Sequence, residues 1–66
     1  MRADRIVEQH KAGLISKIEA RVTLDALSRW SNFNATYADH PDSFKHWTNE
    51  GAAARLALHH FRSTAS

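Results

Sequence analysis

The chain has 66 residues, a net charge of +2 and no cysteine. These properties exclude a multidomain protein, a disulfide-stabilised fold and a zinc site built on cysteine. A chain this short is marginally stable alone, and without disulfides we expect it to gain stability by oligomerising. The alanine-rich composition, with one proline and two glycines, predicts a single all-α domain over residues 1–66.

The first residues of the chain and its hydropathy bear on its cellular location. The opening residues, MRADRIVEQH, lack the apolar run of a signal peptide. No stretch of the sequence approaches the ~18 apolar residues that a membrane span requires. We therefore expect a cytoplasmic protein with no membrane partner.

The first expected element is a short helix over residues 2–12, with Ala3, Ile6 and Val7 on one side. Gly13 follows, and glycine readily takes the left-handed conformation that ends a helix. Ser16 and Glu19 then have the spacing of a capping box, which predicts a new helix start. The alternative is one helix continuing through Gly13, at a cost of about 1 kcal/mol.

The second expected helix covers residues 17–31 and forms the centre of the fold. Its apolar positions occupy more than half of the helix circumference, an arc wide enough for two neighbours. Charged residues fill the remaining wedge at intervals of four: Lys17, Arg21, Asp25 and Arg29. Neighbouring charges of opposite sign can pair along this surface.

Residues 32–40 lose the helical pattern and are expected to form an aromatic loop. Two interpretations of the aromatic patch formed by Trp30, Phe33 and Tyr37 stay open. The rings can close the end of a helical hairpin, or they can form an exposed surface that grips another protein.

A third helix is expected over residues 41–62, because proline suits the first helical position and Asp39 or His40 can cap it. The tail, residues 63–66, is expected to be frayed. Apolar or small residues recur along this helix at intervals of three and four: Phe44, Trp47, Gly51, Ala54, Leu58 and Phe61. The alternative is a turn at Gly51 that divides the segment into two shorter helices.

The spacing of this seam is typical of a helix that packs lengthwise against another at a shallow angle. Small residues at its centre permit close approach of a second backbone. The sequence thus predicts a short N-terminal helix followed by an antiparallel helical hairpin. It also predicts a homodimeric bundle, with the seam shared between the hairpin and a second copy.

No residues are assigned to catalysis, a cofactor or a metal. Adjacent histidines on a helix, such as His59 and His60, diverge by about 100° and cannot both bind one ion. Asp39, His40 and Ser43 have the residue types of a hydrolytic triad but lie too close together to take its geometry. We therefore expect a protein that is not an enzyme.

Two functional hypotheses remain. The first is a small protein-binding regulator, an adaptor or inhibitor of the kind that bacteria and phages use as accessory proteins. The second is a small dimeric DNA- or RNA-binding regulator that contacts phosphates through Arg55, His59 and Arg62. The second is less favoured, because acidic residues are interspersed with the basic ones.

Overall fold

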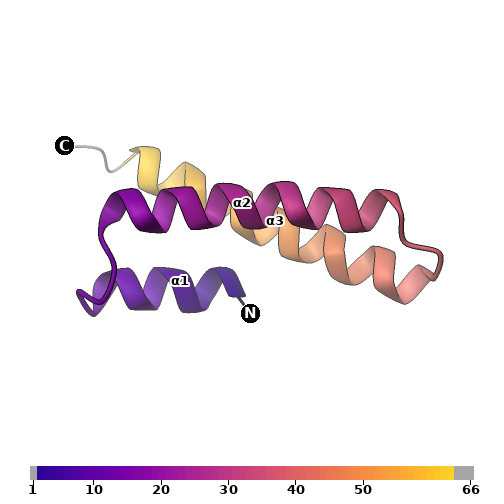
Figure 1. Ribbon diagram of the computed structural model, residues 1–66, viewed down its shortest axis with the longest axis horizontal. Helices are drawn as coiled ribbons and strands as arrows, with labels where there is room; N and C mark the ends of the chain where they lie inside the picture. Colours follow the sequence, from indigo (N-terminus) through magenta and orange to yellow (C-terminus); the bar gives the residue numbers. More distant parts are fainter. Residues whose placement is uncertain (1, 64–66) are drawn as a thin grey trace.

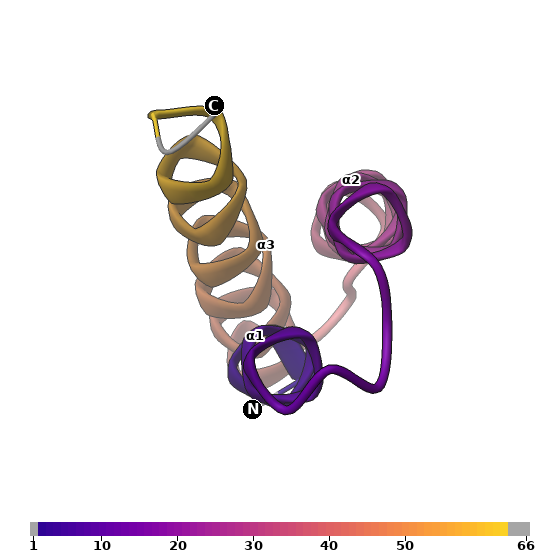
Figure 2. The same cartoon turned by 90° about the vertical axis from the view of Figure 1, so that its left-hand side faces the viewer.

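Three helices make up the computed structural model, which describes residues 2–63: α1 (Arg2–Lys11), α2 (Lys17–Thr36) and α3 (Pro41–Ser63). α2 and α3 run antiparallel as a hairpin, and α1 lies beside the end at which α3 finishes (Figure 1). Viewed end-on, α1 lies alongside both long helices (Figure 2). Residues 2–63 contain no strand, which confirms the all-α prediction and the helical hairpin.

The break between α1 and α2 follows the local signals in the sequence. α1 ends at Lys11, one residue before the predicted end, and Gly13 takes a φ of 78°. Ser16 Oγ accepts a hydrogen bond from the Glu19 N–H at 3.0 Å, and Glu19 Oε1 accepts one from the Ser16 N–H at 3.1 Å. The capping box is therefore confirmed, and the alternative of one helix through Gly13 is wrong.

α2 is longer than expected. It continues to Thr36, so the predicted loop over residues 32–40 is wrong and residues 37–40 alone connect α2 to α3. Asn34 Nδ2 donates to the Trp30 carbonyl at 2.8 Å, and Thr36 Oγ1 donates to the Asn32 carbonyl at 2.9 Å. The side chains of Asn34 and Thr36 thus hydrogen-bond to carbonyl groups of the preceding helical turn. The low helix propensity of these residues had predicted a loop.

α3 is unbroken through Gly51, which excludes the alternative of a turn there. It begins at Pro41, and the Asp42 N–H donates to His40 Nδ1 at 3.2 Å, so His40 supplies the cap. The helix ends at Ser63, one residue past the predicted end and inside the tail that was expected to be frayed. The rest of that tail, residues 64–66, lies outside the described residues.

The core is thin and made largely of small or aliphatic side chains. α1 contributes Ala3 and Ile6 to it, and α2 contributes alanine and leucine. α3 completes it with small and large side chains, among which Phe61 meets the ring of His10 on α1 with ring centroids 5.0 Å apart. The buried apolar residues are Ala3, Ile6, Ala20, Leu24, Leu27, Ala54, Leu58 and Phe61.

Gly51 lies where α3 packs closely against Ser31 of α2. A Cβ placed on Gly51 would stand 3.3 Å from Ser31 Cβ and 3.2 Å from Arg55 Nη1. Ser31 is fully buried at this contact. Glycine inside a helix costs about 1 kcal/mol relative to alanine, and close packing against α2 explains why α3 has it here. The small centre of the seam therefore serves the intramolecular hairpin.

Gly51→Leu is expected to lower the free energy of unfolding by about 1–3 kcal/mol, because the added side chain must push α2 away at Ser31. Thermal or urea unfolding at one fixed protein concentration measures the change. Ala52→Leu is the matched control, since Ala52 is exposed on the same helix. Equal stability of the two variants would contradict the close contact.

A buried carboxylate sits beside this contact. Glu50 is 6% exposed, and its Oε2 has no hydrogen-bond partner. The Ser31 hydroxyl is likewise buried without a partner. A buried polar group without a hydrogen bond destabilises the fold, whereas an apolar group of similar size does not. Sequence reasoning missed Glu50, because a lone glutamate in a helix is usually exposed.

Glu50→Met is therefore expected to raise the free energy of unfolding by about 1–3 kcal/mol. A higher urea midpoint with an unchanged slope would show it. Asn49→Met tests the same chemical change at an exposed neighbour and is expected to give no such gain. A less stable Glu50→Met protein would mean that the carboxylate stabilises the fold.

Candidate interaction surface

The seam of α3 is largely covered by its own chain. Gly51, Ala54, Leu58 and Phe61 are buried against the other two helices, and Trp47 is half-buried. Phe44 alone of the six seam residues keeps most of its side chain in water, at 53% exposed. The sequence predicted that this seam would be shared between the hairpin and a second copy. In the described residues, four large exposed apolar side chains lie on α2 instead: Ile18, Val22, Trp30 and Phe33.

These side chains belong to an apolar stripe on α2. Its large members are more than half exposed, from 53% at Trp30 to 73% at Ile18 and Tyr37. They recur at intervals of three or four residues and share roughly 120° of the helix circumference. The opposite side of α2 is the one in the core. We call this surface the α2 stripe, in which Tyr37 is the residue that directly follows the helix: Ile18, Val22, Ala26, Trp30, Phe33 and Tyr37.

The sequence analysis recognised part of this stripe. It predicted a wide apolar arc on the second helix and assigned it to two neighbours. Both neighbours, α1 and α3, use the side that carries Leu24 and Leu27, so Val22, Ala26 and Trp30 stay in water. Ile18 was missed, although a spacing of four residues from Leu14 onward was the available signal.

The aromatic patch forms the C-terminal half of the stripe. Trp30 stacks on Phe33, with ring centroids 6.2 Å apart and planes 14° apart. Phe33 meets Tyr37 at 4.8 Å, and Trp30 meets Trp47 of α3 edge-on at 6.5 Å. The three rings are therefore held together by helical spacing. Trp30 contacts α3 across the hairpin, while all three rings are more than half exposed.

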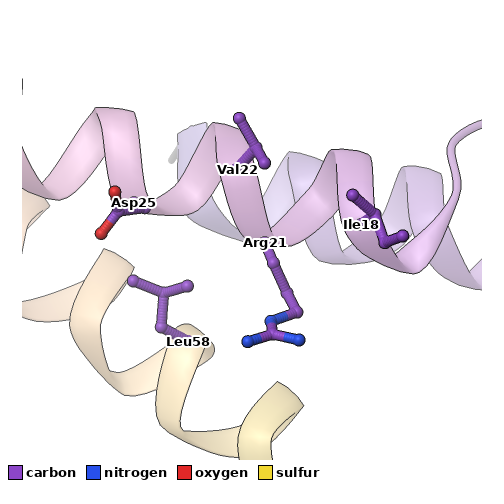
Figure 3. Close-up of a pocket in the computed structure, with 5 residues that line it drawn as sticks. All are labelled: Ile18, Arg21, Val22, Asp25 and Leu58. Carbon is purple, nitrogen blue, oxygen red and sulfur yellow. The ribbon is translucent and has the colours of Figure 1, made fainter.

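A shallow hollow lies between α2 and α3 on the N-terminal side of the patch. Arg21 reaches toward α3 near Leu58, and Ile18 and Val22 of α2 line the same hollow (Figure 3). Asp25 also lines this hollow and forms an ion pair with Arg29, with 3.2 Å between Oδ2 and Nε. The pair is exposed and borders the stripe, so it adds little stability but sets the local charge pattern.

The basic residues proposed for phosphate contact lie in different surroundings. Arg55 is exposed, and its guanidinium lies over Gly51, near Ser31 of α2. His59 lines a separate hollow between α1 and α3, together with Lys11 and Asp4. The side chain of Arg62 lies outside the described part of the chain. Arg55 and His59 are four residues apart on the continuous helix α3, so they lie on one side of it, as the sequence predicts.

The described residues offer neither a clustered metal site nor a membrane-spanning helix. Residues 2–63 contain no group of three or more histidine, aspartate or glutamate side chains placed to hold a metal ion. Over the same residues, each helix is too short or too polar to cross a membrane.

Comparison with known proteins places the chain in no group. It matches no protein-family model, no curated protein and no solved structure. The α2 stripe itself is therefore the feature on which a functional assignment can rest.

Proposed function

We propose that this chain is a small non-enzymatic regulator, an adaptor or inhibitor, that binds other proteins through the α2 stripe. The observation that carries the proposal is the row of large apolar side chains that α1 and α3 leave in water along α2. Contiguous exposed apolar surface of this kind on a small protein typically marks a protein-interaction site.

The composition of the stripe supports a protein partner. Trp30 and Tyr37 offer large contact areas with few rotatable bonds, so ordering them on binding costs little entropy. Their contacts with Phe33 already fix the rings relative to one another. A partner would therefore meet a largely pre-organised surface.

Further parts of the proposal rest on size and composition. We further propose a homodimer, a cytoplasmic location and an accessory role in a bacterium or phage, which the size and composition of the chain support. The nucleic-acid alternative remains an untested prediction.

The double variant Phe33→Ala/Tyr37→Ala is expected to lose target proteins that the unmodified chain retains. The change removes exposed rings and leaves the core residues in place, so circular dichroism should still show a helical protein. The full-length tagged chain is expressed in its source cell, cross-linked, purified and analysed by mass spectrometry. Asn32→Ala, an exposed neighbour off the stripe, is the matched control.

The proposal requires that specific proteins be enriched by the unmodified chain and by the control, and lost with the double variant. Retention of the same proteins by the double variant would contradict it. Binding to a random DNA duplex that falls steeply between two salt concentrations would instead favour the nucleic-acid alternative.

A further inference from the structure

We propose that the α2 stripe is covered, in the isolated protein, by the α2 stripe of a second copy, with the two helices antiparallel about a two-fold axis at Ala26. This inference rests on the proposed function and names one protein partner of the same surface. It moves the dimer contact from the α3 seam, which the chain itself covers, to α2.

The amount of exposed surface agrees with a missing partner. The chain exposes 4879 Å². A folded monomer of 7.5 kDa is expected to expose about 4,250 Å², so the excess is roughly 600 Å². A stable interface covers about 800 Å² on each partner. Burying one face of α2 would therefore bring the exposed area of this chain close to the area expected for a folded monomer of its mass.

The order of side-chain sizes along the stripe fits an antiparallel copy. Ala26 is at the middle, with Val22 four residues before it and Trp30 four residues after it. An axis at Ala26 places Val22 of one copy opposite Trp30 of the second copy. It likewise places Ile18 at the level of Asn34, one residue from Phe33. The two aliphatic residues of the N-terminal half of the stripe thus lie near the aromatic rings of the other copy.

The small central residue allows the two helices to approach. Ala26 lies between two shallow hollows, one shared with Arg29 and Phe33 and the other with Ile6 and Thr23, and Trp30 lines both. In the antiparallel arrangement, side chains of the second copy can enter these hollows. A contact of this kind closes on itself, because the same surface serves both copies.

The order of side-chain sizes also favours the antiparallel arrangement over a parallel one. A parallel pair in register would bring Trp30 of one copy to the level of Trp30 of the other. The antiparallel pair instead brings Trp30 to the level of the smaller Val22, and Asp25 and Arg29 flank the contact. Both of these charged side chains are accessible there, since their ion pair leaves them 46% and 82% exposed respectively.

The first test is sedimentation of the full chain over a concentration series. The unmodified protein is expected to sediment as a dimer. Ala26→Glu is expected to raise the dissociation constant by roughly 30-fold or more, because it buries two like charges at the axis. Leu56→Glu is the matched control, since Leu56 is 72% exposed on α3 and should leave the dimer intact.

The second test fixes the orientation and uses the absence of native cysteine. Ala26→Cys is expected to form a disulfide-linked dimer under mild oxidation, because the two copies of this residue meet at the axis. Tyr37→Cys is expected not to, since an antiparallel pair separates these positions by roughly 30 Å along the helices. Equal cross-linking of both variants would overturn the antiparallel arrangement.

The outcomes separate this inference from the proposed function. A monomer at all concentrations, or a dimer unaffected by Ala26→Glu, would overturn the inference even if target proteins still bind the stripe. A dimer that Ala26→Glu dissociates would support the inference even if no other protein is captured.

Discussion

The structure depends on the close contact of α2 and α3 at Ser31 and Gly51. The two helices can approach because neither residue has more than a small side chain at the contact. The buried residues of α3 near this contact, Ala54 and Leu58, are small or aliphatic. The Trp30 and Phe33 rings of α2 and the Tyr37 ring just after it are more than half exposed. The small centre of the seam thus serves the hairpin, and the large rings of the second helix stay largely in water.

This arrangement links the fold to the proposed function. A core of small and aliphatic residues gives modest stability, and Glu50 and Ser31 reduce it further by burying unpaired polar atoms. The α2 stripe offers further burial, because five of its large side chains are more than half exposed. If a second copy covers the stripe, then a target that binds the same surface must separate the two copies. Binding would then depend on the concentration of the regulator, through mass action.

Local signals in the sequence were sufficient for several features. The capping box of Ser16 and Glu19, the left-handed Gly13 and the start at Pro41 each depend on residues close together in the chain. The continuity of α3 through Gly51 also followed from its spacing. The length of α2 could not be predicted in this way, because Asn34 and Thr36 form their hydrogen bonds to helix carbonyls only once the helix is formed.

The location of the interaction surface could not be predicted from periodicity. Both long helices carry apolar residues at helical spacing, and spacing alone does not tell which of two apolar faces will be inside. The deciding property is size: Gly51 and Ala54 suit a close helix contact, and bulky Trp30 and Phe33 do not. The burial of Glu50 was missed for a related reason. It depends on how α3 packs against the other helices, which the local sequence does not show.

The central claim, that another protein chain covers the α2 stripe, is tested most directly by hydroxyl-radical footprinting across a dilution series. The account predicts that Ile18, Val22, Trp30 and Phe33 become more reactive on dilution, while the exposed Leu56 stays equally reactive throughout. Stripe side chains whose reactivity does not change with concentration would contradict it.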